Sequence, residues 1–378
     1  MNIRKLKRVF VAMSGGVDSS VAAFLLAKNK KYEVIGCFIK GYNIDGCQGA
    51  DAEDARRVAG FLKIPFYVID LEKEYKKLVV DYMINGYKKG ITPNPDVMCN
   101  KEIKFGLFLE KALGMGADYI ATGHYVRLAS PALSLYIAKD LNKDQSYFLW
   151  TLTQEQLKHC LFPIGDYLKS EVREIAKKAG LSTAEKKDSQ GICFLGMVKF
   201  KDFLKQYLSI KKGDVLSVDG KKIGEHDGVW FYTIGQRHIG IMNYESGIIG
   251  RRETKPLYII KKNVKKNILI VAEGENNQAL YKKEIKLANV NFINSKESKE
   301  VGLPYRCPTS QILVRVRYRQ PLIKARIMNN ESRIKDSPII HNSKFIIQFD
   351  APVKFIAPGQ SAVFYGKNGE MLGGGIII

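Results

Sequence analysis

The chain has 378 residues, of which 46% are hydrophobic and 26% charged, and its formal net charge is +22. This length predicts two or three domains, and no apolar run is long enough to span a membrane. Residues 1–196 hold 29 Lys and Arg against 22 Asp and Glu, whereas residues 197–378 hold 31 against 16. An enzyme that acts only on small molecules rarely needs such an excess. We therefore expect a polyanionic partner, most simply a nucleic acid, with a generally basic proteome as the alternative explanation.

The basic N-terminus leads directly into an apolar strand without a small-residue cleavage site, so we expect no signal peptide and a cytoplasmic protein. Six cysteines occupy positions 37, 47, 99, 160, 193 and 307, and none form a C-x-x-C pair. This spacing disfavours a structural zinc site. A disulfide in a cytosolic protein is expected to be transient and catalytic rather than structural.

Strands and helices alternate over the first 122 residues. Strands are expected at 9–13, 32–39, 65–69 and 118–122, and helices at 21–27, 51–62, 73–87 and 101–115. This alternation predicts an α/β fold in which helices cover both faces of a parallel sheet. Ligands of such sheets bind at the carboxyl ends of the strands, which is where the glycine-rich residues 14–20 and 123–124 fall.

The pattern changes towards the C-terminus. A strand is expected at 135–137 and helices at 154–160, 170–180 and 199–207, whereas short strands separated by turns such as Asp219-Gly220 follow from about residue 210. We predict an N-terminal catalytic domain over 1–208, a small central β-rich domain over 209–275 and a C-terminal β-barrel over 276–378.

Residues 14–20, Ser-Gly-Gly-Val-Asp-Ser-Ser, lie between the first expected strand and a helix N-terminus. Glycines permit a sharp turn, and the hydroxyls, backbone N–H groups and helix dipole favour a phosphate. The Gly-Lys-Ser/Thr of the common P-loop is absent. Asp18 makes sense in an anion site if Mg²⁺ bridges it to phosphate oxygens. The string resembles the PP-loop of ATP pyrophosphatases, which adenylate a substrate; the alternative is a capped glycine-rich turn.

Two later segments carry cysteines in settings that favour a reactive thiolate. Pro93 and Pro95 stiffen a loop that places Asp96 and Cys99 beside a helix N-terminus, which lowers the pKa of a thiol. Cys193 lies two residues after Gly191, in a segment that begins with two lysines at 186 and 187. Each cysteine could instead be a buried packing residue. The spacing does not show whether the two cysteines meet.

Eight strings then carry a resemblance over essentially the whole chain. They are SGGVDSS (14–20), TPNPDVMCNKEIKF (92–105), ATGHY (121–125), KDQSYFL (143–149), KDSQGICF (187–194), TIGQR (233–237), VRYRQ (316–320) and PGQSAVFY (358–365). Together, and in this order, they resemble the tRNA 2-thiouridylase family.

The resemblance implies an ATP- and Mg²⁺-dependent enzyme that adenylates O2 of the wobble uridine of tRNA and replaces this oxygen with sulfur, releasing AMP and pyrophosphate. It implies that Cys193 carries a persulfide delivered by a donor or relay protein. Cys99 would attack the persulfide to release sulfide, or form a transient disulfide with Cys193 after the transfer. Asp96 would act as a general acid or base beside the flipped base.

The resemblance also implies three sets of contacts, with no separate metal site on the protein. The implied ATP-binding residues are Ala12, Met13, Ser14, Gly15, Gly16, Val17, Asp18, Ser19, Ile39 and Gly123. The implied target-base residues are Asn94, Pro95 and Asp96. The implied tRNA contacts are His124, Lys143, Asp144, Gln145, Arg317, Tyr318 and Gln360. Cys47, in a short polar loop, is expected to have no role.

Two other interpretations remain open from the residues. A different PP-loop enzyme, such as an amidotransferase-type synthetase or a 4-thiouridine-type modifier, would share the loop but not the paired cysteine segments. A non-catalytic RNA-binding protein with a relic ATP site is disfavoured, because Ser14, Gly15, Gly16, Asp18 and Ser19 are all intact.

Overall fold

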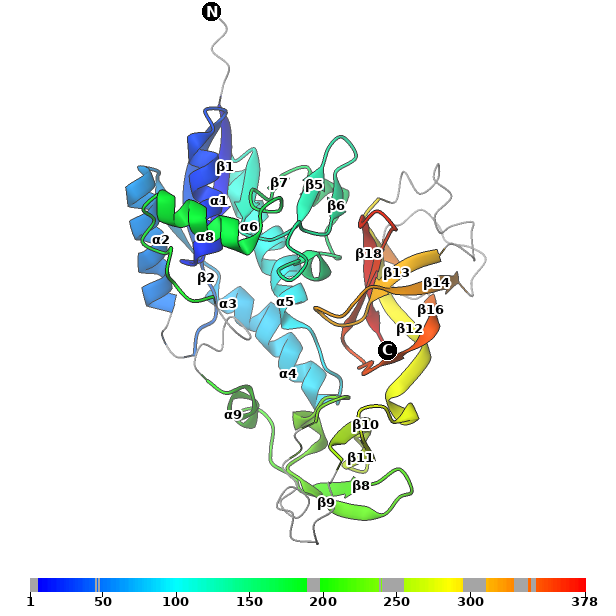
Figure 1. Cartoon of the computed structure of the whole chain (residues 1–378). Coiled ribbons are helices and arrows are strands. Elements are labelled where there is room, and N and C mark those ends of the chain that lie inside the picture. Colours follow the sequence, from blue (N-terminus) through cyan, green and yellow to red (C-terminus); the bar gives the residue numbers. More distant parts are fainter. Residues whose placement is uncertain are drawn as a thin grey trace, which may run out of the picture.

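The computed structural model describes residues 6–44, 46, 48–188, 198–237, 239, 255–294, 311–329, 339–340 and 345–378. An N-terminal α/β domain, a central β-rich part and a C-terminal barrel follow one another along the chain (Figure 1). The predicted fold class is thereby confirmed. The exact domain boundaries at 208/209 and 275/276 stay predictions. Cys47 and Cys193 lie outside the described residues.

Five strands form one parallel sheet in the order β3-β2-β1-β4-β7. The strands are β1 (Lys7–Ala12), β2 (Tyr32–Lys40), β3 (Phe66–Asp70), β4 (Tyr119–Thr122) and β7 (Cys160–Leu161). Ala12 at the end of β1 pairs with Cys37 of β2 and with Thr122 of β4. The segments that follow β1 and β4 therefore start side by side at the carboxyl edge of the sheet.

Helices cover both faces of this sheet, as predicted, because alternate residues of a strand point to opposite sides. Val9 and Val11 pack in one apolar cluster with α1, α2 and α8, whereas Phe10 packs in another with the helices between residues 72 and 114. The helices of the first face are α1 (Val17–Lys28), α2 (Gln48–Leu62) and α8 (Lys169–Lys178). Those of the second face are α3 (Glu72–Tyr75), η1 (Lys76–Val80), α4 (Asp81–Lys88), α5 (Pro95–Met98), η2 (Cys99–Leu107) and α6 (Phe108–Gly114).

The second face contains two continuous helical rods, each with a π-helical section, η1 and η2. The rod that carries Cys99 starts at Pro95, six residues before the start predicted at 101. The Asn94 side chain caps it by accepting a hydrogen bond from the Val97 N–H at 3.3 Å, and proline suits a first helical turn. The loop before this rod therefore ends earlier than the proline content suggested.

The prediction of a helix over 154–160 is wrong in its second half. α7 (Gln154–Leu157) ends early, and Cys160 instead pairs with Ile120 as part of β7. The backbone carbonyl of His159 accepts from the Ile120 N–H at 2.7 Å, so pairing with the open edge of β4 replaces a further helical turn. The remaining elements of this domain are β5 (Arg127–Ala129), β6 (Ser134–Tyr136), η3 (Ser146–Phe148) and α9 (Phe200–Lys205).

The central part is a four-stranded sheet in the order β10-β11-β8-β9. Its elements are β8 (Gly213–Leu216), β9 (Lys222–His226), η4 (Val229–Phe231), β10 (Leu257–Asn263) and β11 (Ile268–Glu273). The predicted hairpin at Asp219-Gly220 joins β8 to β9, and Gly220 adopts φ +85°. α4 runs from the N-terminal domain towards this sheet (Figure 1), and Gly90, just beyond α4, lies against Val264.

Six strands of the C-terminal part form a closed barrel, because β12 pairs with both β16 and β18. Its elements are η5 (Gln278–Leu280), β12 (Tyr281–Phe292), β13 (Gln311–Arg315), β14 (Ile323–Asn329), β15 (Ile339–Ile340), β16 (Phe345–Lys354), β17 (Ser361–Tyr365) and β18 (Met371–Ile377). β18 contains three consecutive glycines. A Cβ on Gly373 would overlap the carbonyl oxygen of Asn291, and one on Gly374 would lie 2.8 Å from the Trp150 ring.

The barrel is joined to the N-terminal domain by buried polar contacts. Arg315 of β13 donates to the Asp144 carboxylate at 2.8 Å, with side chains 10% and 0% exposed. The Trp150 indole donates to the Ser361 hydroxyl at 2.9 Å, and Asn291 donates to the Trp150 carbonyl at 2.8 Å. These contacts hold the two parts in a definite orientation. Within the described residues, none of the helices combines the length and apolar character needed to cross a membrane.

Candidate active site

The loop between β1 and α1 is shaped around backbone amides. Gly15 adopts φ +73°, and a Cβ there would overlap the Asp51 carbonyl oxygen, so a glycine is required. Gly16 occupies the N-cap of α1, and among the residues that the structure describes no side chain caps this helix. The Ser19 and Ser20 hydroxyls donate to the Gly16 carbonyl at 3.2 and 2.8 Å, which fixes the turn. The first N–H groups of α1 and its helix dipole therefore fit a phosphate group.

Gly123 lies directly against this loop. A Cβ on Gly123 would be 2.7 Å from the Ser19 backbone nitrogen, so the end of β4 touches the first turn of α1. Ile39 lies near the end of the neighbouring strand β2, paired with Ile69. The structure thus brings the predicted ATP residues to one edge of the sheet. Their contact with a nucleotide stays a prediction.

The Asp18 carboxylate is held by a cation from the distant helix α8. Lys169 Nζ lies 2.7 and 2.9 Å from the two Asp18 oxygens, and the Tyr125 hydroxyl donates to the same carboxylate at 2.8 Å. Burial and the negative charge of Asp18 raise the pKa of Tyr125, so the hydroxyl stays a donor. Within the described residues, no three His, Cys, Asp or Glu side chains form a metal-binding group. A single carboxylate still suits Mg²⁺ that takes its other ligands from phosphates and water.

Lys169 also connects the loop to Asp188, five residues before Cys193 in the sequence. Asp188 accepts contacts from Lys169 at 2.9 Å, Lys143 at 2.7 Å and Arg173 at 2.7 Å. Burial alone would raise the pKa of Asp188, but hydrogen bonds from Lys143 and Lys169 outweigh it and lower the pKa to about 2. Three cations from distant positions therefore converge on this one carboxylate close to the phosphate loop.

Asp96 and Cys99 lie three residues apart on one helical rod, so they share one side of it. Burial raises the pKa of Asp96, which makes a proton easier to hold, while the nearby Lys104 opposes this shift. Cys99 is 5% exposed and lies where α5 passes into η2. A carboxyl whose pKa is raised can exchange protons with a substrate. A neighbouring thiol in the first turns of a helix can act as a nucleophile.

His124 connects the phosphate loop to the rod that carries Cys99. Its ring lies 5.8 Å from the Phe105 ring, and its Nδ1 is 2.8 Å from the Thr122 hydroxyl oxygen. Burial, with a smaller effect of Lys104, lowers the pKa of His124, and the residue is 7% exposed. Its predicted contact with tRNA stays a prediction; in this conformation the ring is packed inside the domain.

The other predicted tRNA residues make contacts within the protein. Lys143 binds Asp188, and Asp144 pairs with Arg315 at the barrel interface. The Gln145 side-chain oxygen accepts from the Tyr125 N–H at 2.9 Å. These contacts tie the segment 143–145 into the protein framework, and its binding to tRNA stays a prediction.

Three predicted tRNA residues belong to the barrel. Arg317 donates to the Ile234 carbonyl at 2.7 Å, the Tyr318 ring lies 4.5 Å from the Phe148 ring, and Gln360 donates to the Thr92 carbonyl at 2.9 Å. All three therefore lie where the barrel meets another part of the chain.

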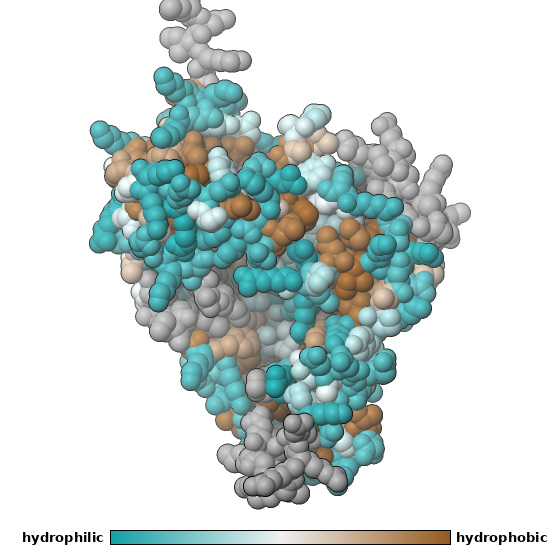
Figure 2. All heavy atoms as spheres, in the orientation of Figure 1, coloured by the Kyte–Doolittle hydropathy of each residue, from teal (hydrophilic) through white to brown (hydrophobic). Residues whose placement is uncertain are grey.

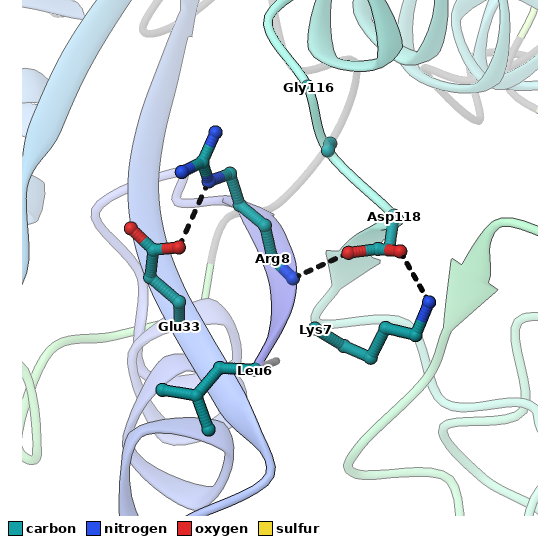
Figure 3. Close-up of a pocket in the computed structure, with 7 residues that line it drawn as sticks. Leu6, Lys7, Arg8, Glu33, Gly116 and Asp118 are labelled. Carbon is teal, nitrogen blue, oxygen red and sulfur yellow. Dashed lines mark hydrogen bonds and ion pairs between the residues drawn. The ribbon is translucent and has the colours of Figure 1, made fainter. Parts of the chain in front are cut away.

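A pocket at the opposite, amino-terminal edge of the sheet is no candidate for the site (Figure 3). Lys7 lies 2.7 Å from Asp118, and Arg8 lies 3.1 Å from Glu33, so the charged groups in the pocket neutralise one another (Figure 3).

Comparison with known proteins identifies the family. Family models described as tRNA methyl transferase HUP domain, tRNA methyl transferase PRC-barrel domain and aminomethyltransferase beta-barrel domain match residues 7–197, 201–273 and 282–377. A tRNA-specific 2-thiouridylase MnmA of Geobacillus kaustophilus is 46% identical over 99% of this chain and 96% of its own length. The MnmA of Buchnera aphidicola is 44% identical over 100% of this chain and 98% of its own. The chain belongs to the tRNA-specific 2-thiouridylase family.

Among solved structures, a U34-tRNA thiolase NcsA from Methanococcus maripaludis aligns with this 2-thiouridylase family member at a TM-score of 0.35 and 18% identity, covering 54% of this chain and 69% of its own. The resemblance predicted from the sequence is confirmed by the two close relatives.

Sequence analysis missed two residues that complete the phosphate-loop site of this 2-thiouridylase family member. Lys169 is 151 positions from Asp18, and Tyr125 is 107 positions from it. Lysines are common throughout this chain, so the local sequence does not distinguish Lys169 from the other lysines as a partner of Asp18. Tyr125 directly follows the Gly123-His124 pair, and that position was the only available signal.

Proposed function

We propose that this chain catalyses the ATP-dependent 2-thiolation of the wobble uridine of tRNA. The observation that carries the proposal is the 46% identity, over 99% of the chain, with a relative named a tRNA-specific 2-thiouridylase. The N-terminal domain supports it, because it contains an amide-lined loop at the carboxyl edge of the sheet, a helix with an acid and a thiol, and three cations around Asp188.

In the first step, uridine O2 attacks the α-phosphorus of ATP, and pyrophosphate leaves. The N–H groups of the first turn of α1 would bind the phosphates, and Asp18 would hold Mg²⁺. Lys169, which contacts Asp18 at 2.7 Å, would stabilise the charge on the leaving pyrophosphate. Adenylation converts a poor leaving group, the O2 oxygen, into a good one, AMP.

In the second step, sulfur displaces AMP at C2 of the base. Cys193 would bring the sulfur as a persulfide, and Cys99 would provide the second thiolate. Either Cys99 attacks the persulfide and frees sulfide, or the terminal sulfur attacks C2 and Cys99 then resolves the bond to Cys193. Both routes end in a Cys99–Cys193 disulfide, which a thiol reductant must reduce by two electrons before the next turnover. Asp96 would shuttle the proton beside the base.

The tRNA would bind where the three parts of the chain meet. Figure 2 shows a hollow on this face between the N-terminal domain, the barrel and the central part, bordered by hydrophilic residues and by an apolar patch on the barrel side. The net charge of +22 suits a phosphate backbone. A target base must leave the anticodon stack to reach a protein pocket.

The test uses the full chain with tRNA transcript, ATP, Mg²⁺, a persulfide donor and a thiol reductant, and measures 2-thiouridine in digested tRNA by mass spectrometry. Native protein should form the product. Cys99→Ser and Cys193→Ser should both abolish it, whereas Cys193→Ser should still release pyrophosphate when tRNA is added. Cys160→Ala is the control, because burial raises the pKa of that thiol and it should not react. Absence of product from the native protein with an active donor would refute the proposal.

A further inference from the structure

The segment before the helix that carries Asp96 and Cys99 is held from the C-terminal barrel. The Thr92 N–H donates to the Pro358 carbonyl at 2.8 Å. The Gln360 side-chain amide donates to the Thr92 carbonyl at 2.9 Å and, more weakly, to the Pro93 carbonyl at 3.4 Å. Two adjacent residues of a catalytic-domain loop are thus bound by a short stretch of the barrel, which lies more than 260 residues further along the chain.

Gly359, between these two barrel residues, touches the same loop through its backbone. It is buried and adopts φ +92°, and a Cβ there would lie 2.8 Å from the Thr92 carbonyl oxygen. A side chain is therefore excluded both by conformation and by space. The stretch is itself rigid, because the Gly359 N–H donates to the Ile377 carbonyl and the Ile377 N–H donates to the Gln360 carbonyl, each at 2.8 Å.

The loop is also confined on its other sides. The Thr92 hydroxyl donates to the Thr233 hydroxyl of the central part at 3.2 Å. Pro93 lies against α4, where a Cβ on Gly86 would be 2.7 Å from the proline ring. Asn94, 8% exposed, then caps the helix. All three parts of the chain therefore meet at the residues that set where the helix of Cys99 begins.

We propose that Gln360 and Gly359 are positioning residues. Through them the C-terminal barrel holds the loop before the helix of Asp96 and Cys99, so that these two side chains stay in position to react. The proposal rests on the proposed function, because it takes Asp96 and Cys99 as the reacting groups. It differs from the sequence-based prediction that Gln360 contacts tRNA. The Gln360 amide nitrogen lies 2.9 and 3.4 Å from two carbonyl oxygens of the loop, and this nitrogen is the donor that an RNA phosphate would require.

The kinetic test separates positioning from RNA binding. Gln360→Ala should lower kcat for 2-thiouridine formation about tenfold at saturating tRNA, with KM for tRNA within about threefold, because a small displacement of reacting groups costs rate rather than affinity. Gln360→Glu should be as impaired, because its carboxylate keeps the size but cannot donate to two carbonyls. Gly359→Ala should lower kcat at least as much. Glycine has no side chain that could contact tRNA, so this loss would come from displacement of the loop. Gln348→Ala, on an exposed residue of the same barrel, is the matched control.

Hydrogen exchange tests the same contact without relying on activity. Backbone amides in peptides covering residues 91–99 should exchange hydrogen about tenfold faster in Gln360→Ala and Gly359→Ala than in the native chain. In Gln348→Ala their exchange rate should equal that of the native chain. If Gly359→Ala does not fold, the two Gln360 variants decide the question. A raised KM for tRNA with native kcat, or native exchange in residues 91–99, would overturn the positioning role. If the native chain forms no 2-thiouridine, the proposed function fails, while the exchange data still decide whether the barrel holds the loop.

Discussion

Lys169→Met tests whether a lysine from α8 stabilises the phosphate loop and also contributes to the binding of ATP. The Lys169 side chain is 12% exposed, and its Nζ contacts Asp18 at 2.7 and 2.9 Å and Asp188 at 2.9 Å. Removing one partner of a fully buried ion pair costs roughly 3–5 kcal/mol. Here the Asp18 and Asp188 side chains are 33% and 30% exposed, and Asp188 keeps two other cations. Solvent screening therefore reduces the expected loss of unfolding free energy to about 1.5 kcal/mol.

Urea denaturation of the full chain measures this loss, and Lys178→Met on the same helix is the matched control. Lys178 pairs with Glu174, but both side chains are well exposed, so this variant should lose less than about 0.5 kcal/mol. The dissociation constant of ATP, measured by calorimetry with Mg²⁺, should rise about tenfold in Lys169→Met, the equivalent of about 1.4 kcal/mol. Equal denaturation midpoints for the two variants, together with native ATP affinity, would refute this role of Lys169.

Three other predictions follow from the structure. Arg315→Met leaves the buried Asp144 carboxylate without its cation and should lower the unfolding free energy by about 3 kcal/mol in urea denaturation; restoration in Arg315→Met/Asp144→Asn would attribute the loss to the ion pair. Asp96→Asn should abolish thiolation yet stabilise the fold at pH 7, because burial raises the pKa of Asp96 and its ionised form is disfavoured in the folded state. This gain should disappear as the pH falls below the ordinary carboxyl pKa of about 4, and a gain that persists at pH 3 would contradict the cause. Gly373→Ala should lower the thermal unfolding temperature, because its methyl group would overlap the carbonyl of Asn291, whereas Gly220→Ala, at an open turn where the added methyl meets no other atom, should lower it less.

Local sequence patterns were sufficient for the parallel sheet and its phosphate loop. β1 is a short apolar run, the glycines and hydroxyls of 14–20 favour only a tight turn before a helix, and strand–helix alternation has few folded solutions. The end of α7 was not predictable in this way. Residues 158–160 have no strong preference of their own, and the open edge of β4 decided that Cys160 is a strand residue. The glycines of β18 likewise belong to a strand because they pair with β12 and β17, and Asn291 and Trp150 leave no space for a side chain at 373 and 374.

The sequence by itself determined the family, the phosphate loop and the two cysteine-bearing segments, because each depends on residue types within a few positions of one another. Only the tertiary structure decided which distant groups complete the site. Lys169 reaches Asp18 across 151 positions, and Gln360 reaches Thr92 across 268. Such contacts depend on how helices and strands pack, and a lysine or glutamine has the same local surroundings in the sequence whether it faces solvent or a catalytic loop. The phosphate loop at 14–20 can therefore be predicted from the sequence, whereas the contact of Lys169 with Asp18 is known only from the tertiary structure.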